Sequence, residues 1–142
     1  MASNGNVVVA GGNDELLYSE DGINWQRADN PPFGRVDSIA WGQDRFVASN
    51  GLNILLSRDG VSWELAGRDD VFIRQIRWVG YRFMAVGSRG NPLRVTVMES
   101  VDGYNWTSTA TNYHGFGQDI AYNNQVWVVV WPSQEGFMPP EI

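Results

Sequence analysis

The feature that most limits how this chain can fold is a seven-residue pattern, Ser-x-Asp-Gly-x-x-Trp, which occurs three times. It reads SEDGINW at 19–25, SRDGVSW at 57–63 and SVDGYNW at 100–106. Glycine can take the positive φ that a tight turn needs. An aspartate carboxylate can accept hydrogen bonds from the N–H groups of its own turn. We therefore expect each copy to close a hairpin, with the Ser hydroxyl bonding in the same turn and the Trp ring buried.

A second phrase recurs between these copies. It reads SIAWGQDRFVASNG at 38–51, QIRWVGYRFMAVGS at 75–88 and DIAYNNQVWVVVWP at 119–132. Each version has an Ile two residues before an aromatic residue, and another aromatic follows five residues later. Strand-length runs separated by Gly, Asn and Asp indicate antiparallel hairpins, and helical periodicity is absent. Each unit therefore resolves into four short strands.

A four-stranded unit that repeats about every 40 residues is typical of a β-propeller blade. The seven-residue pattern resembles the Asp-box, or BNR repeat, of sialidase-like β-propellers. The phrase between the copies is similar to propeller repeats common in bacterial and phage-associated proteins. The resemblance covers nearly the whole chain and implies an all-β fold of four-stranded antiparallel blades, in which the repeated turn is a folding device.

We expect one domain of about three blades in the 142 residues. Its expected parts are a partial blade at 1–30, blades at 36–67 and 73–110, a half blade at 117–132 and a tail at 133–142. The segment VVVAGGNDELLYSEDGINW aligns without gaps on RFVASNGLNILLSRDGVSW, which predicts that the chain starts at the second strand of a blade. This interpretation gives thirteen strands.

Three blades are too few for a closed ring, because propellers have about four to eight. An open fan would expose the apolar faces of its end blades, and such faces usually mark an interface. We therefore predict a homodimer that completes a ring of six to eight blades. A larger ring, or a longer parent chain, remains an alternative.

Composition excludes several classes of site. A net charge of −6 disfavours nucleic-acid binding. The absence of cysteine excludes thiolate metal sites, disulfides and Cys nucleophiles. The first residues do not form a secretory signal, and no apolar run approaches the roughly 20 residues of a membrane helix. We expect a soluble protein without cofactor or metal, while the compartment stays open.

Ligand candidates lie on loops at the strand ends opposite the repeated turns: 27–37, 67–74, 109–119 and an insertion at 88–97. Aromatic faces beside arginines suit sugar or peptide recognition, although a solvated loop face is the alternative. His114 is expected to be exposed and without metal-binding partners. Asp69 and Asp70 are expected to form a polar turn rather than a cation site. The candidate ligand-binding residues are Phe33, Arg35, Arg68, Phe72, Arg74, Arg89, Tyr113, His114 and Phe116.

No catalytic residue is predicted. The resemblance to sialidases implies an arginine triad, a Tyr–Glu pair and an Asp acid/base, but none of these can be assigned to positions in this chain. Strand alternation should place Arg74 and Arg77 on opposite faces.

The leading hypothesis is therefore a non-catalytic binding or structural module, either carbohydrate-binding or associated with phage particles. The first alternative is a protein-binding scaffold that resembles photosystem assembly propellers, which would use Arg35, Arg68, Arg74 and Arg89. The second is a glycosidase.

Overall fold

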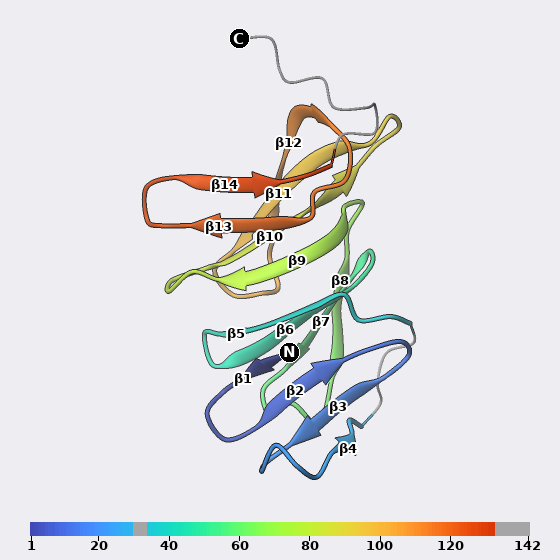
Figure 1. The fold of residues 1–142 in the computed structure, drawn as a ribbon, viewed down its shortest axis with the longest axis vertical. Helices are drawn as coiled ribbons and strands as arrows, with labels where there is room; N and C mark the ends of the chain where they lie inside the picture. Colours follow the sequence, from blue (N-terminus) through green and yellow to red (C-terminus); the bar gives the residue numbers. More distant parts are fainter. Residues whose placement is uncertain (30–33, 133–142) are drawn as a thin grey trace.

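The structure is a computed structural model that describes residues 1–29 and 34–132. Its regular structure consists of four antiparallel sheets that follow one another along the length of the molecule (Figure 1). The described ranges contain no helix, so none there is long and apolar enough to cross a membrane. The expectation of an all-β fold built from four-stranded antiparallel units is confirmed.

Three sheets have four strands each, in sequential order, and the fourth sheet has two. The first sheet contains β1 (Ala2–Ser3), β2 (Val8–Gly11), β3 (Leu16–Ser19) and β4 (Gln26–Arg27). The second contains β5 (Ser38–Gly42), β6 (Arg45–Asn50), β7 (Asn53–Ser57) and β8 (Glu64–Arg68). The third contains β9 (Phe72–Trp78), β10 (Phe83–Arg89), β11 (Arg94–Ser100) and β12 (Thr107–His114). The fourth contains β13 (Asp119–Tyr122) and β14 (Trp127–Val130).

Two details differ from the sequence-based expectation. The chain does not start at a second strand, because Ala2 and Ser3 pair with Val9 and Val8 as the short strand β1. This strand lacks the Ile-x-aromatic phrase that marks the other first strands, so the pattern gave no sign of it. The expected insertion at 88–97 lengthens a hairpin instead of forming a loop, since β10 and β11 stay paired as far as Arg89 and Arg94.

The repeated aromatic residues face each other within each unit. Trp41 pairs with Phe46 across the β5–β6 hairpin, and their ring centroids lie 4.6 Å apart. Trp78 and Phe83 repeat the arrangement at 4.7 Å in the third sheet. Tyr122 and Trp127 do so at 4.3 Å in the fourth. Such cross-strand aromatic pairs stabilise a hairpin and fix its register.

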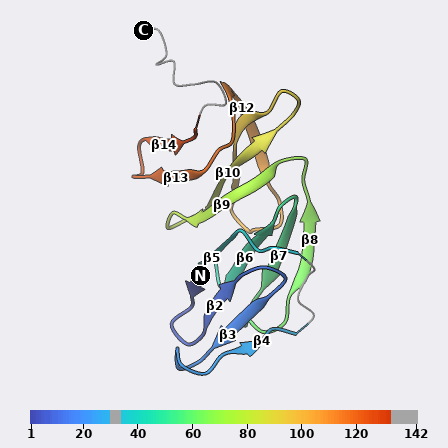
Figure 2. The same cartoon turned by 45° about the vertical axis from the view of Figure 1, so that its right-hand side comes forward.

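Neighbouring sheets meet along their first and second strands: β1 and β2 contact β5, β5 and β6 contact β9, and β9 and β10 contact β13. Contact also occurs farther out, because the Asp29 N–H after β4 donates to the Val61 carbonyl of the second sheet at 2.7 Å. Figure 2 shows the sheets following one another in chain order from β1–β4 at the bottom to β9–β12 toward the top. The Ser38 hydroxyl supports one of these contacts, because it accepts a hydrogen bond from the Ile76 N–H at 2.9 Å.

Each gap between sheets holds its own hydrophobic cluster, so the two middle sheets are buried on both faces. In β6, Phe46 and Ala48 pack toward the first sheet, whereas Val47 packs toward the third. All three side chains are fully buried. This explains why β6 lacks the alternation of polar and apolar residues that marks a strand with one exposed face.

The glycines of the second and third repeated turns, Gly60 and Gly103, fit closely against the preceding sheet. Gly60 has φ +79°, and a Cβ atom at this position would lie 2.7 Å from Val9 Cγ2. Gly80, in the β9–β10 turn, has φ +98° but open space around it. A substitution at Gly80 therefore adds backbone strain alone, whereas the same substitution at Gly60 adds both backbone strain and steric crowding.

We predict that Gly60→Ala destabilises the protein more than Gly80→Ala. Both variants suffer left-handed strain of roughly 1–2 kcal/mol. Only Gly60→Ala adds crowding against the first sheet, which costs roughly 1–3 kcal/mol more. Urea unfolding of both variants measures the difference, and equal losses of stability would contradict the close fit.

Candidate functional site

The three SxDGxxW turns share one hydrogen-bond network. In the third turn, Asp102 Oδ1 accepts the N–H groups of Tyr104 and Asn105, each at 2.8 Å. The Ser100 hydroxyl donates to Asp102 Oδ1 at 3.0 Å and accepts the Gly103 N–H at 2.8 Å. The first and second turns repeat these bonds around their own aspartates. The predicted roles of Ser, Asp and Gly are confirmed.

These donors make the aspartates stronger acids. Partial burial alone would raise the pKa of Asp102, but the Asn105 N–H, the Asn105 amide and the Tyr104 N–H lower it to about 2. Burial also opposes the shift at Asp59, where the N–H groups of Ser62 and Val61 still lower the pKa. The donors of Asn24 and Ile23 lower the pKa of Asp21 in the same way. All three carboxylates are thus held in their charged form.

The tryptophans of the turns differ in burial. Trp63 is 7% exposed, and its Nε1–H donates to the Gly60 carbonyl at 3.1 Å. Trp106 makes the same bond to Gly103 at 2.9 Å and is partly buried. Trp25 is 38% exposed, so the prediction that its ring is buried is wrong. The second and third turns pack against a preceding sheet, whereas nothing in the described part of the chain covers the first.

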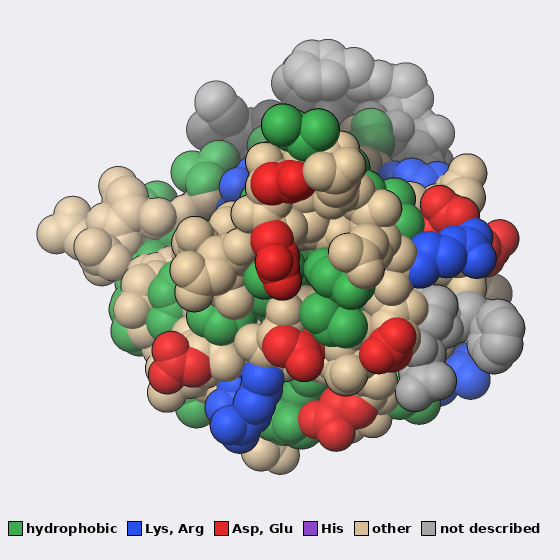
Figure 3. All heavy atoms as spheres, turned by 90° about the horizontal axis from the view of Figure 1, so that it is seen from below, with side chains coloured by type: hydrophobic (Ala, Val, Ile, Leu, Met, Phe, Trp, Pro, Cys, Tyr) green, Lys and Arg blue, Asp and Glu red, His purple; other side chains and the backbone are tan. Residues whose placement is uncertain are grey.

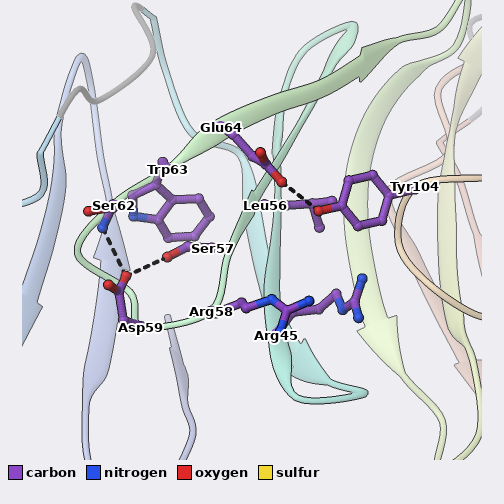
Figure 4. Close-up of a pocket in the computed structure, with 9 residues that line it drawn as sticks. All are labelled: Arg45, Leu56, Ser57, Arg58, Asp59, Ser62, Trp63, Glu64 and Tyr104. Atoms are coloured by element: carbon purple, nitrogen blue, oxygen red, sulfur yellow. Dashed lines mark hydrogen bonds between the residues drawn. The ribbon is translucent and has the colours of Figure 1, made fainter.

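A pocket of about 340 Å³ lies beside the second turn, where the second and third sheets meet (Figure 4). Its aromatic lining residues are Trp63 of the second sheet and Tyr104 of the third, and all its other lining residues come from the second sheet and its turns. Its lining residues are Arg45, Leu56, Ser57, Arg58, Asp59, Ser62, Trp63, Glu64 and Tyr104.

The charged side chains that line this pocket are two arginines, Arg45 and Arg58, and two carboxylates, Asp59 and Glu64. Arg45 lies with its Cζ 5.4 Å from the centre of the Tyr104 ring and donates to the Asp102 carbonyl at 3.0 Å. Within residues 1–29 and 34–132, neither Arg45 nor Arg58 forms an ion pair with a carboxylate. The Glu64 carboxylate instead accepts the Tyr104 hydroxyl at 2.5 Å, and this bond raises the pKa of Tyr104. The pocket therefore presents two guanidinium groups suited to an anionic group.

A smaller hollow of about 180 Å³ lies at the equivalent place beside the third turn. Arg82 takes the place of Arg45 there, but Glu99 stands where the second sheet has Leu56. Glu99 binds Arg82 at 2.5 Å, so that arginine already has its carboxylate. Of these two pockets, the one beside the second turn has arginines, Arg45 and Arg58, that form no ion pair with a carboxylate of the described residues.

The predicted ligand residues lie at the other ends of the strands and form separate pairs. Arg35 and Arg74 both approach Asp37, at 3.1 and 3.8 Å. Arg74 occupies a β-bulge, because Ile73 pairs with Gly87 and Gln75 with Val86. Its partner lies toward the second sheet, whereas Arg77 binds Asp119 of the fourth sheet at 2.9 Å.

The remaining candidates are spread over two sheet boundaries. Arg89 binds Asp70 at 3.1 Å, and Tyr113 stacks on Trp131 with ring centroids 4.8 Å apart. His114 is exposed, as expected from the sequence. Three further candidates, Arg68, Phe72 and Phe116, are also exposed. Phe33 lies outside the described residues. These residues therefore line a broad surface and are not gathered in one described pocket.

The sequence analysis did not single out the pocket residues. Arg58 and Tyr104 occupy variable positions inside the SxDGxxW pattern, and Arg45 lies in the turn before a repeated aromatic. The repeat gave no signal for them, since Arg82 repeats Arg45 and the positions of Arg58 and Tyr104 hold Val101 and Val61 in the other full units. In the described part of the chain, no group of three or more His, Asp and Glu residues could hold a metal ion.

Comparison with known proteins gives a likeness to solved structures. No family model matches the chain, and no curated protein matches it. A solved structure of YCF48 bound to D1 peptide is similar, with a TM-score of 0.61 and 20% sequence identity. The likeness covers 89% of this chain and 43% of that chain, so this chain spans less than half the length of its neighbour. It shows that the fold is that of a β-propeller, with the sheets as its blades.

We predict that the protein becomes less stable in acid. A carboxylate with a lowered pKa stabilises the fold above its unfolded pKa, and this contribution disappears as the pH falls through the folded value. For Asp102 the interval runs from 3.8 down to about 2, and Asp21 and Asp59 shift in the same direction. The urea midpoint should therefore decrease through this interval. Asp102→Asn should weaken the pH dependence, and an unchanged acid profile in that variant would contradict the assignment.

Proposed function

We propose that the protein is a non-catalytic, protein-binding β-propeller module that takes an extended peptide carrying a carboxylate. The observation that carries this proposal is the pocket lined by Arg45, Arg58, Trp63 and Tyr104. Its two guanidinium groups would bind the carboxylate, and the aromatic walls would cover adjoining apolar atoms of the peptide. The YCF48 neighbour, which binds a peptide on the same kind of fold, supports a protein partner over a sugar.

The pocket can be tested with a peptide array of acidic sequences, each paired with its Asn and Gln counterpart. We expect the chain to bind acidic peptides and to lose affinity when the carboxylates become amides. Arg58→Ala should weaken binding about tenfold or more, because a hydrogen bond to a charged group contributes roughly 1.5–3 kcal/mol.

Arg68→Ala is the matched control. Arg68 is an exposed arginine of the same sheet, but it lies at the far end of β8 among the loop residues predicted from the sequence. Loss of peptide binding in Arg68→Ala with retention in Arg58→Ala would move the site to those loops. If the chain bound no peptide on the array but did bind to a glycan array, a carbohydrate-binding module would be favoured.

The hydrogen-bonded Tyr104 and Glu64 in this pocket make a glycosidase the second function to consider. A tyrosine nucleophile needs either a lowered pKa or a neighbouring general base, and Glu64, which accepts the Tyr104 hydroxyl and raises its pKa, is placed as such a base. The adjoining Asp59 carboxylate, whose pKa is lowered, is poorly suited to donate a proton as a general acid. The residues that line the pocket therefore offer the Tyr104–Glu64 pair no suitable general acid, which supports binding without turnover.

We predict no hydrolysis of fluorogenic sialosides by the purified chain. Turnover that is lost in Tyr104→Phe and kept in Tyr81→Phe would overturn the non-catalytic proposal. Tyr81 is a suitable control because its hydroxyl also forms a hydrogen bond at a sheet boundary, with Tyr122 at 3.1 Å, but lies outside the pocket.

We also propose that copies of the chain associate to complete the propeller. The described residues form three four-stranded blades and one two-stranded blade. Closed propellers have about four to eight blades, so two copies contain enough for one ring. Repetition of the same pocket around such a ring would turn weak single contacts into avidity.

A further inference from the structure

The second and third SxDGxxW turns pack on the preceding sheet in the same way. A Cβ atom at Gly60 would lie 2.7 Å from Val9 Cγ2, and one at Gly103 would lie 2.8 Å from Val47 Cγ2. Val9 and Val47 occupy equivalent positions when VVVA at 7–10 is aligned on RFVA at 45–48. Both valines are fully buried. The contact between a turn glycine and a valine of the second strand is therefore a repeated joint of this fold.

A second contact accompanies each joint, two residues before the valine. The ring of Tyr104, which follows Gly103, lies against Arg45 at 5.4 Å. At the other joint, a Cβ atom at Gly60 would lie 3.3 Å from Val7 Cγ1. In each preceding sheet, the valine and the residue two positions before it (Val9 and Val7, or Val47 and Arg45) both face the turn. This agrees with the two-residue period of a strand. We call these three-residue segments, 7–9 and 45–47, receiving segments.

The first turn has the same shape but no sheet to receive it. Within residues 1–29 and 34–132, no atom outside the turn lies within 4 Å of a Cβ at Gly22, although its φ of +74° is close to the +79° of Gly60. Ile23 is 80% exposed and Trp25 is 38% exposed. The end of the molecule that carries the first sheet shows hydrophobic side chains at the surface among carboxylates (Figure 3).

The fourth sheet has an equivalent receiving segment, but no SxDGxxW turn of the described residues packs on it. Val126 and Val128 align with Val7 and Val9, which receive the second turn. They are 57% and 56% exposed, and Val130 beyond them is 56% exposed. Residues 120–132 carry no charged side chain, so burying this face leaves no charge without a partner.

We infer that the first turn of one chain docks on the β14 face of a second copy, with Gly22 on Val128 and Ile23 on Val126. This inference rests on the proposed self-association and specifies its contact. The first and fourth sheets lie at opposite ends of the row of sheets, so the contact is head-to-tail (Figure 1). Two copies then close with two identical joints and eight sheets, within the usual size of a propeller.

The strand pairing favours docking of whole sheets over an exchange of strands. For β3 of one copy to extend the β13–β14 sheet of another, it would need the edge that β2 already occupies. β2 pairs with β3 along its length, from Val8 with Ser19 to Gly11 with Leu16. An exchange would break this pairing, whereas contact between faces leaves it intact.

The experiment is native mass spectrometry of the 142-residue chain at micromolar concentration. We expect twice the chain mass of 15.9 kDa. Ile23→Lys and Val126→Glu should each raise the concentration needed for association about tenfold or more, because a charge would be buried without a partner. Mixing the two variants should restore a dimer that contains one of each, since one joint then pairs Lys with Glu and the other is unchanged.

Val101→Glu is the matched control, because Val101 is 63% exposed in the third turn but lies away from the joint. Circular dichroism should show the same β content in every variant, as all three side chains are exposed. A monomeric wild-type chain would refute both self-association and the joint. It would not bear on peptide binding, which the peptide array tests separately. A dimer that survives Ile23→Lys and Val126→Glu, or variants that do not pair when mixed, would refute the joint alone.

Discussion

The structure depends on the contacts that the glycines of the second and third turns make with the sheet before each of them. The Ser and Asp side chains fold the SxDGxxW turn by binding its own N–H groups, so the turn keeps its shape without help from its neighbours. The absence of a side chain at Gly60 or Gly103 then lets that turn come close to a valine of the preceding sheet. A local hydrogen-bond network and a single missing Cβ thereby set the spacing of consecutive blades.

Much of the fold could be predicted because the repeated residues interact with neighbours that are close in the sequence. Asp, Gly and Ser in the turns, and aromatic pairs such as Trp41 and Phe46, act within one hairpin, so their pattern is visible in the sequence. The burial of Trp25 was wrongly predicted because it depends on a neighbouring sheet, which no local pattern can report. β1 was missed because two residues are too short to show any period.

The candidate pocket was harder to predict because it arises between sheets. Arg58 and Tyr104 belong to different copies of the repeat, and only the packing of the second sheet on the third brings them to one pocket. The sequence analysis instead selected loop arginines, of which Arg35, Arg74 and Arg89 bind carboxylates of the same or a neighbouring loop. A pocket lined by residues of two different units is therefore not visible in the pattern of either unit alone.

The fourth sheet shows how an incomplete blade can be held in place. Two strands alone form a sheet of marginal stability. Here Arg82 of the third sheet lies with its Cζ 5.9 Å from the Tyr122 ring and 5.6 Å from the Trp127 ring, while Arg77 holds Asp119. The β13–β14 hairpin is thus anchored before any partner arrives. A molecule that docks on it would meet an ordered platform, and little conformational entropy would be lost on binding.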